Sequence, residues 1–413
     1  MPDLRPFLGI RYASADDMGD LVCPPYDIIS AEQESVLLNR HPNNAVRIEL
    51  AKSASSDDPG RGQSDRYERA AAAFQQWMSE GVLETEASPS LYIYRQDFTT
   101  PDGKRGRVTG VIGALRLEEF GDRSGVLPHE RTMEGPKKDR MALLEALGAN
   151  VSPIYGIYRG AGALGPFFDS LENRPPFARF ADEERILHRL WIISAPAEIE
   201  MLAAAVADGP LVIADGHHRY ETALAYHRAH EDEPGEHDSI LSLCVDADAE
   251  DLVVLPYNRV LRGVGDGLAR RLLDISGTPI EERDVPAALA SEDAAHRFVF
   301  VLPTERFLIE ISDEEVVEAV GDAARAWRDL DVVALHEALL PRLIPDGGVE
   351  FGFTKDPEEV GRLVAAGWDA GILLRPLSAA QIVDVARSGE RMPQKASYFW
   401  PKALTGLVFH SLR

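Results

Sequence analysis

Apolar residues recur along the chain in short runs whose spacing switches between two periods. Spacing typical of strands is found at 45–50, 91–98, 108–117, 153–158, 190–194, 211–214, 240–245, 252–255, 298–302 and 307–311. Spacing typical of helices is found at 67–80, 137–148, 196–207, 219–230, 314–327, 332–343 and just before Gly277. Strands that alternate with helices predict an α/β or mixed α+β fold.

Breaks in this pattern indicate turns and loops. The two prolines of Cys23-Pro24-Pro25-Tyr26-Asp27 remove backbone donors, so this segment cannot form regular helix. The stretch 53–65 is rich in Ser, Asp and Gly and predicts an exposed loop. Thr100-Pro101-Asp102-Gly103 is a turn sequence, so the strands on either side of it are expected to pair as a hairpin.

Charge and cysteine content narrow the class of protein. The net charge of −25, from 43 basic and 68 acidic residues, repels nucleic acid and anionic lipid, so neither is an expected partner. The same charge can equally serve solubility alone. Cys23 and Cys244 form neither a disulfide framework nor a four-thiolate metal site. No apolar run reaches signal-peptide or membrane-span length, and we expect a cytoplasmic protein.

The sharpest chemical signal is Asp215-Gly216-His217-His218-Arg219. An apolar strand ends at Asp215, Gly216 permits a tight turn and close approach of a ligand, and a helix follows at once. The first N–H groups of a helix lack partners and lie at its positive end, so they favour an anion. Arg219 adds a planar fork that suits phosphate oxygens, and the histidines add donors. The segment predicts a phosphate-type anion site.

Two alternatives to an anion site remain open for this segment. A strand, a glycine and a helix often form a turn that binds nothing. A zinc site is the second alternative, but zinc ligands are usually separated by one or more residues, unlike His217 and His218, and no cysteine lies nearby in sequence. We therefore predict no metal held by these residues alone.

A second polar segment, Pro128-His129-Glu130-Arg131-Thr132, precedes the helix expected at 137–148. A carboxylate at such a position can act as a general base if a substrate hydroxyl comes within hydrogen-bonding reach. Alternatively, Glu130 pairs with Arg131 or a nearby lysine on a solvated surface.

Two further segments are consistent with either a structural or a functional role. Tyr26-Asp27, after the double proline, forms either a turn or the wall of a pocket. The aromatic and lysine-rich run 392–402 is either a terminal strand packed on the core or a docked tail that closes a pocket. The sequence has no P-loop, dinucleotide-binding, protein-kinase or serine-hydrolase motif.

These segments together resemble the family known as domain of unknown function 1015. The resemblance rests on Arg5-Pro6-Phe7, on residues 24–27 and 127–132, on the Asp-Gly-His-His-Arg-Tyr-Glu-Thr-Ala block at 215–223, and on 392–402. The central part is similar to the ParB/sulfiredoxin superfamily, and Asp-Gly-His-His-Arg is also found in free-serine kinases, which make O-phosphoserine with ADP or ATP. The order His129-Glu130, helix, Pro153-Ile154 strand and Asp215 resembles theirs, although about 60 residues separate Ile154 from Asp215 here.

The resemblance implies roles for individual residues. Glu130 would activate the acceptor hydroxyl, and Asp215 would lie beside the transferred phosphoryl group. Gly216, His217, His218 and Arg219 would hold the phosphates of ATP or ADP, with Mg²⁺ bridging oxygens. His129, Arg131, Tyr26 and Asp27 are the predicted substrate-binding residues.

The resemblance also implies a division of the chain and an activity. The expected parts are an N-terminal α+β region at 1–104, a ParB/sulfiredoxin-like catalytic core at 105–264 and a C-terminal α/β domain at 265–413. The expected activity is nucleotide-dependent phosphorylation of a small hydroxyl compound, with free L-serine as the first candidate. The alternatives are a non-catalytic nucleotide-binding switch of the ParB type and an anion-binding regulatory protein. The sequence carries no signal for oligomeric state.

Overall fold

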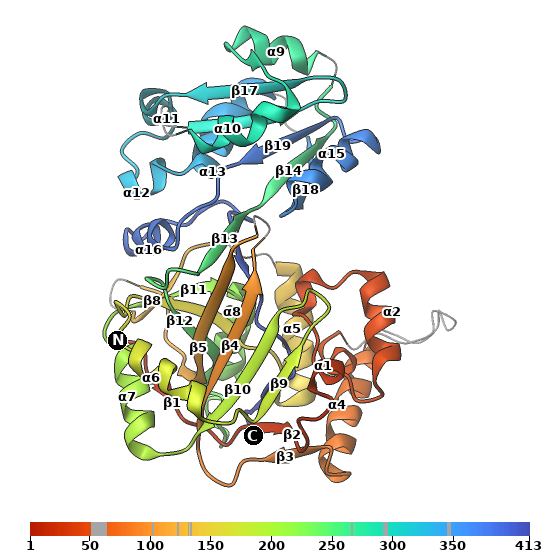
Figure 1. Cartoon of the computed structure of the whole chain (residues 1–413), viewed down its shortest axis with the longest axis vertical. Coiled ribbons are helices and arrows are strands. Elements are labelled where there is room, and N and C mark those ends of the chain that lie inside the picture. Colours follow the sequence, from red (N-terminus) through yellow and green to blue (C-terminus); the bar gives the residue numbers. More distant parts are fainter. Residues whose placement is uncertain are drawn as a thin grey trace. The chain divides into compact units, whose positions relative to one another are not determined.

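The computed structural model describes residues 1–50, 64–100, 103–121, 124–130, 132, 134–265, 267–291, 296–344 and 348–413. The chain folds into two compact units (Figure 1). The first unit comprises 1–128, 132–252 and 401–413, and the second comprises 129–131 and 253–400. Residues 53–63 of the loop predicted at 53–65 lie outside the described residues, and residues 64 and 65 belong to a helix instead. The three-part division expected from the resemblance stays a prediction.

The first unit is built on a mixed β-sheet. Its strands are β1 (Leu4–Arg5), β4 (Leu91–Thr99), β5 (Arg105–Arg116), β6 (Val126–Pro128), β8 (Ile154–Tyr158), β9 (Ala178–Ala181), β10 (Leu187–Ile193), β11 (Leu211–Asp215) and β12 (Ser239–Asp246). Among the described residues these nine strands lie in the order β6-β11-β8-β12-β5-β4-β10-β9, with β1 beside β5. The pairs β11–β6 and β12–β8 are parallel and the other pairs are antiparallel. The mixed α/β fold expected from the sequence is confirmed.

The hairpin expected around residue 100 is present. β4 and β5 pair antiparallel from Tyr92 opposite Ile112 to Thr99 opposite Arg105. At its turn the Thr100 amide donates to the carbonyl of Lys104 at 2.8 Å. Gly103 has a φ of +85°, which glycine adopts without the steric cost that a side chain would bring.

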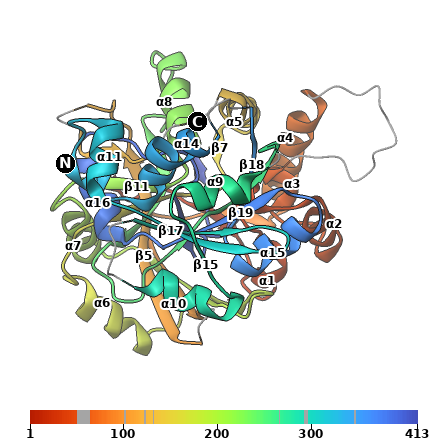
Figure 2. The same ribbon diagram turned by 90° about the horizontal axis from the view of Figure 1, so that it is seen from above.

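Helices cover this sheet. They are α1 (Met18–Leu21), η1 (Tyr26–Ile28), α2 (Ala31–Arg40), α3 (Val46–Glu49), α4 (Ser64–Ser79), α5 (Glu134–Leu147), α6 (Gly165–Ser170), η2 (Leu171–Asn173), α7 (Pro196–Val206) and α8 (His217–Ala229). Helices α2 and α4 lie close together in both views (Figures 1 and 2), α3 contacts both of them, and α5 packs against α8. Two short strand pairs complete the unit, β2 (Ile10–Tyr12) with β3 (Leu83–Thr85) and β7 (Ala149–Asn150) with β21 (His410–Ser411).

The strand predicted at 45–50 is wrong, because Val46–Glu49 is a short helix. The Asn44 side chain accepts a hydrogen bond from the Val46 amide at 2.9 Å, a contact that favours the start of a helix. In a segment this short, apolar alternation does not separate strand from helix, and packing against α4 decides.

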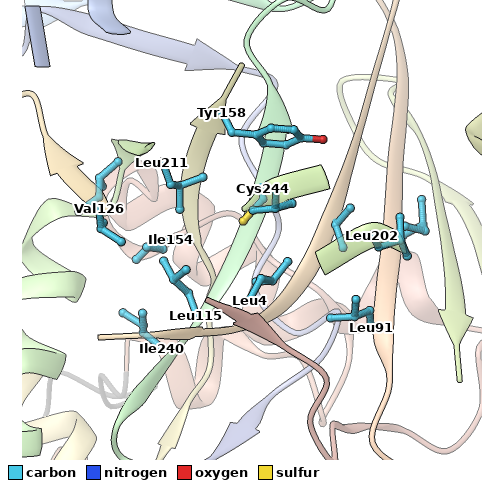
Figure 3. Packing of buried hydrophobic residues seen from close by; sticks show 14 of the residues in the cluster. Leu4, Leu91, Leu115, Val126, Ile154, Tyr158, Leu202, Leu211, Ile240 and Cys244 are labelled. Carbon is cyan, nitrogen blue, oxygen red and sulfur yellow. The ribbon is translucent and has the colours of Figure 1, made fainter. Parts of the chain in front are cut away.

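The core of the first unit lies between the sheet and its helices. Leu4, Leu91, Ile154, Leu202 and Leu211 meet there from five different elements (Figure 3). Cys244 lies in the same cluster, and both cysteines of the chain are buried and free. Burial raises the pKa of the Cys244 thiol to about 12, so this thiol is a packing group and not a nucleophile.

The second unit has an antiparallel sheet of its own. Its strands are β14 (Asn258–Arg262), β15 (Thr278–Pro279), β16 (His296–Val301), β17 (Arg306–Ile311), β18 (Glu350–Thr354) and β19 (Ala370–Leu374), in the order β15-β17-β16-β19-β14-β18 among the described residues. A separate pair joins β13 (Val253–Pro256) to β20 (Ser397–Trp400). Part of the run 392–402 is therefore a strand, as the first of its two alternatives predicted.

The described helices of the second unit have at most nine residues each, whereas α4 of the first unit has 16. They are α9 (Leu268–Asp274), η3 (Glu282–Asp284), α10 (Val285–Ala290), α11 (Asp313–Val320), α12 (Arg325–Arg328), α13 (Asp331–Val333), the π-helical turn η4 (Ala334–Leu339), α14 (Leu340–Leu343), α15 (Pro357–Ala365) and α16 (Ala379–Arg387). The single helix predicted at 314–327 is wrong, because Gly321 ends α11 with a φ of +68°. Over the described part of the chain, no helix is both long enough and apolar enough to cross a membrane.

Candidate anion site

The turn between β11 and α8 takes the form that its sequence predicts. β11 ends at Asp215, and Gly216 adopts a φ of +90° before α8 begins at His217. A Cβ at Gly216 would meet the Arg219 side chain and Ile154 at 3.0 Å, so both the backbone angle and the space require glycine. No side chain caps α8, and the first backbone N–H groups of a helix have no partner within the helix.

Asp215 is held between two cationic side chains. Arg219 Nη2 donates to Asp215 Oδ2 at 2.7 Å, and Lys402 Nζ donates to Asp215 Oδ1. The Asp215 side chain is 17% exposed and that of Lys402 is 6% exposed. Burial alone would raise the pKa of Asp215, but the charges of Lys402 and Arg219 outweigh it and hold this pKa well below its usual range. Asp215 is therefore ionised at neutral pH.

At this turn one carboxylate faces both an ammonium and a guanidinium. The positive end of the α8 dipole lies at the same turn. The Arg219 side chain makes a second hydrogen bond, because its Nη1 donates to the carbonyl of Pro153. The start of α8 is a positive, partly buried turn, which is the environment that a phosphate group favours.

The two adjacent histidines, His217 and His218, differ in burial. His217 is buried, and its charge is among the influences that lower the pKa of Asp215. His218 is half-buried on the first turn of α8. Their roles as phosphate donors stay predictions.

Tyr26 belongs to the same neighbourhood, on the loop that follows the double proline. The guanidinium of Arg140 stacks over its ring at 4.1 Å. Burial raises the pKa of the Tyr26 hydroxyl to about 12, although the charge of Arg219 acts in the opposite direction. The Tyr26 amide also donates to the buried carboxylate of Glu49 at 3.1 Å. Asp27, by contrast, is exposed.

A small cavity of about 40 Å³ lies beside Arg219. Polar residues on its wall are Arg140, Asn150, Ser152, Arg219 and Thr222. Two buried atoms, Arg219 Nε and Thr222 Oγ1, have no hydrogen-bond partner among the described residues. A polar cavity of this size has room for water, which would satisfy such groups.

The second predicted segment belongs to the second unit from His129 to Arg131. His129 is buried, with 3.2 Å between its Nε2 and the Ser397 hydroxyl. Its carbonyl accepts from the Met392 amide at 2.8 Å, which fixes the backbone of the segment. Arg131 lies outside the described residues.

Glu130 is half-buried, and its charge acts on the fully buried guanidinium of Arg259. Burial lowers the pKa of Arg259 to about 9, and Glu130 opposes that shift. The role of Glu130 as a general base and its alternative as a surface ion-pair partner of Arg131 or a lysine both stay predictions. Asp215, Gly216, His217, Arg219 and Tyr26 come together in the first unit, whereas His129 and Glu130 belong to the second.

Lys402 was not among the residues predicted for the site. It lies in the run 392–402, which is dense in lysine and aromatic residues. One of the two alternatives for this run was a docked tail that closes a pocket. Neither spacing nor composition could indicate which of its lysines meets Asp215, because 187 residues separate the two along the chain.

The Mg²⁺ that the resemblance implies stays a prediction. Both carboxylate oxygens of Asp215 already accept from Arg219 and Lys402. Over the described residues, no group of three or more His, Cys, Asp or Glu side chains could hold a metal ion. A Mg²⁺ ion held mainly by phosphate oxygens would instead arrive as part of a nucleotide substrate.

The sequence profile of one family, described as a protein of unknown function and numbered DUF1015, matches residues 4–333. The chain belongs to this family. The matched range includes the Asp215 turn and the segment around Glu130, and the predicted resemblance to this family is confirmed. No curated protein matches the sequence.

Solved structures show a distant likeness to this member of the family. A mutant of free serine kinase in complex with ADP is 12% identical, with a TM-score of 0.37 over 71% of this chain and 94% of that chain. A conserved hypothetical protein from Pyrococcus furiosus is 13% identical, with a TM-score of 0.36 over 68% and 89%. SbnI with a C-terminal truncation, from Staphylococcus aureus, is 10% identical, with a TM-score of 0.38 over 71% and 85%.

Proposed function

We propose that this protein holds the phosphate groups of a nucleotide at the start of α8 and transfers one phosphoryl group to a small hydroxyl compound. ATP and ADP are the candidate donors, and free L-serine is the first candidate acceptor. The observation that carries the proposal is the ionised, partly buried Asp215 between Lys402 and Arg219 at an uncapped helix start. Two cationic side chains beside the positive end of a helix favour a phosphate over a neutral ligand.

Each group has a role in the proposed transfer. The oxygen of the acceptor hydroxyl forms a bond to the terminal phosphorus, and the bond from that phosphorus to the bridging oxygen breaks. The acceptor's proton passes to a carboxylate, for which Glu130 is the candidate by the motif resemblance. The nucleotide leaves with one phosphate fewer, and the positive start of α8 stabilises the charge on its new terminal oxygen.

The direct test is incubation of the pure protein with L-serine and either ADP or ATP, with Mg²⁺ or with EDTA, followed by mass spectrometry for O-phosphoserine. Product is expected with one of the two nucleotides. Nucleotide binding without any product would contradict the transfer and favour the non-catalytic switch.

The anion site is tested by replacing Arg219. Arg219→Ala removes a charge-assisted contact to phosphate, so ADP binding measured by calorimetry should weaken about 10- to 100-fold. Arg228→Ala is the matched control, because Arg228 lies on the same helix but pairs with Glu119 at the surface. Equal affinity of Arg219→Ala and the wild type would contradict a phosphate site at this turn.

The general base is tested by Glu130→Gln, which keeps the shape of the side chain but cannot take up the acceptor's proton. Turnover should fall about 10²- to 10⁴-fold while ADP affinity stays within a factor of about two. Glu134→Gln, at an exposed residue paired with Lys137, is the control and should retain turnover. An equal loss of turnover and affinity in Glu130→Gln would remove Glu130 from the role of base.

A further inference from the structure

Two adjoining aromatic side chains of the second unit are exposed and have no role in the proposed function. Phe351 and Phe353 lie on the same face of β18, because side chains two residues apart on a strand share a face. They are 36% and 39% exposed, and in the described part of the chain they are the only aromatic residues among the large exposed hydrophobic ones. Exposed apolar residues that are scattered singly are common, whereas adjoining ones indicate a binding surface.

These two rings belong to an aromatic row that also includes Tyr257 and Tyr398. The rings of Phe351 and Phe353 stack with their centroids 6.4 Å apart and their planes 17° apart. Tyr257 meets Phe353 edge-on at 6.4 Å, and Tyr398 meets Tyr257 edge-on at 5.4 Å. Tyr257 lies between β13 and β14, and Tyr398 lies on β20, so the whole row belongs to the second unit. Aromatic faces of this kind bind the flat ring of a ligand by stacking.

Two lysines lie against the aromatic row. The Lys355 ammonium is 4.8 Å from the centre of the Tyr398 ring, and the Lys395 ammonium is 5.0 Å from the centre of the Tyr257 ring. Among the described residues, neither lysine pairs with a carboxylate. Two such cations beside aromatic rings favour a ligand that carries negative charge.

The backbone at Lys395 is strained. Its φ is +57°, in the left-handed region that residues other than glycine rarely adopt. Such residues persist where the surrounding structure holds them, and they gather at ligand-binding and active sites. Glycine would relieve the strain, but the ammonium beside Tyr257 would then be lost.

A third cation lies against the aromatic row. Arg259 is fully buried, and its guanidinium is 5.6 Å from the centre of the Phe353 ring. Its Nε donates to His336 and its Nη1 donates to the Tyr257 carbonyl, but its Nη2 has no hydrogen-bond partner among the described residues. A buried donor without a partner is destabilising, and a ligand or an ordered water can satisfy it. The charge of Glu130 already acts on this guanidinium, so the two lysines are the cations left for a charged ligand.

We infer that the aromatic row is a binding surface for a small compound that joins a flat aromatic ring to a negative charge. The ring of the ligand stacks on Phe351 and Phe353, and its charge meets the ammonium groups of Lys355 and Lys395. The inference goes beyond the proposed function, because it uses no residue of the anion site and needs no phosphoryl transfer. Aromatic carboxylates and nucleotides share this chemistry, and the probes below distinguish them.

Titrations with three probes, followed by ligand-detected NMR, test the inference. Phenylacetate has a ring and a charge, cyclohexylacetate has the charge without an aromatic ring, and 2-phenylethanol has the ring without the charge. Phenylacetate should bind about tenfold more tightly than either of the other two. Absence of phenylacetate binding, or equal affinity for either of the other probes, overturns the inference.

The double variant Phe351→Leu/Phe353→Leu keeps apolar side chains but removes both rings, so phenylacetate should bind about tenfold more weakly. Leu273→Ala, at an exposed leucine of α9, is the control and should bind like the wild type. Circular dichroism checks that each variant is folded. A double variant that binds like the wild type overturns the inference. Loss of phenylacetate binding in Arg219→Ala would move the ligand to the first unit and would also overturn it.

Lys395→Gly separates a binding role from a structural one. Glycine adopts a φ of +57° without strain, so this variant should melt at a higher temperature than the wild type. Phenylacetate should nevertheless bind about 5- to 10-fold more weakly, because an ammonium beside the ring has been lost. A more stable variant with unchanged phenylacetate affinity overturns the inference.

Titration with AMP distinguishes the two sources of the ligand. AMP affinity that falls in the Phe351→Leu/Phe353→Leu variant, together with phenylacetate affinity, indicates that the aromatic row binds a nucleotide base. AMP affinity that stays unchanged while phenylacetate affinity falls assigns the row to an aromatic carboxylate.

Discussion

At the scale of single residues, burial strongly lowers the pKa of one histidine in each unit. His410 in the first unit lies edge-on to Phe7, with 2.9 Å between its Nε2 and the Ser239 hydroxyl. Burial lowers the pKa of His410 to about 4, and burial together with the Arg259 charge lowers that of His336 in the second unit to about 3. Both rings are therefore neutral at pH 7 and resist protonation while the protein is folded.

The sign of the resulting pH dependence follows from the lowered pKa. An unfolded histidine titrates near 6.5, so the unfolded chain takes up a proton at a higher pH than folded His410 does. The stabilising contribution is complete above pH 6.5 and is lost as the pH falls towards 4, by about 3 kcal/mol in total. His410→Gln keeps a polar group near Ser239 but cannot titrate. Urea denaturation gives the free energy of unfolding of the wild type and of the variant. The difference between the two should change by about 3 kcal/mol between about pH 7 and pH 4. A difference that stays constant with pH would contradict the lowered pKa of His410.

At the scale of elements, the start of α8 depends on a backbone that only glycine adopts easily. Gly216→Ala would put a methyl group at φ +90° and 3.0 Å from Arg219 and Ile154. We expect a loss of about 1–2 kcal/mol from the backbone angle, with a further loss from the contacts, and weaker ADP binding because Arg219 must move.

Gly361→Ala is the matched control for this substitution. Gly361 lies within α15, without a positive φ and with nothing within 4 Å of the added methyl group. Alanine is the better helix former, so this variant should gain about 0.5–1 kcal/mol of stability. Chemical denaturation of both variants measures the contrast, and similar effects at the two positions would contradict it.

At the scale of the whole molecule, the first unit depends on a segment far away in sequence. Residues 401–413 supply the buried side chains of Leu404, Leu407, Val408, Phe409 and Leu412. Burial of these side chains contributes about 10 kcal/mol, which is as large as the net stability of a typical domain. A chain that stops before Pro401 should therefore lose the fold of the first unit while the second unit, whose residues end at Trp400, keeps its core.

Hydrogen exchange read by mass spectrometry would measure this difference. Peptides from 253–400 should retain slow exchange in the shortened chain, and peptides from the sheet of the first unit should exchange fast. Slow exchange in both units would show that the C-terminal segment is dispensable for folding.

The sequence by itself determined the features whose causes are local. The helix α8, the strand β11 and the turn between them follow from apolar spacing, from a glycine and from the uncapped start of a helix, all close together along the chain. The β4–β5 hairpin follows in the same way from a turn sequence between two apolar runs. The geometry of the candidate anion site could be predicted for this reason before any contact was known.

Only the tertiary structure decided what depends on residues distant in sequence. Packing against α4 turned 45–50 from an expected strand into a helix, because so short a pattern does not fix its own conformation. A partner of Asp215 is one of the two lysines in the run 392–402, and chain topology selected Lys402. The assignment of His129 and Glu130 to the second unit was likewise beyond local spacing, since their backbone pairs with Met392, far away in sequence.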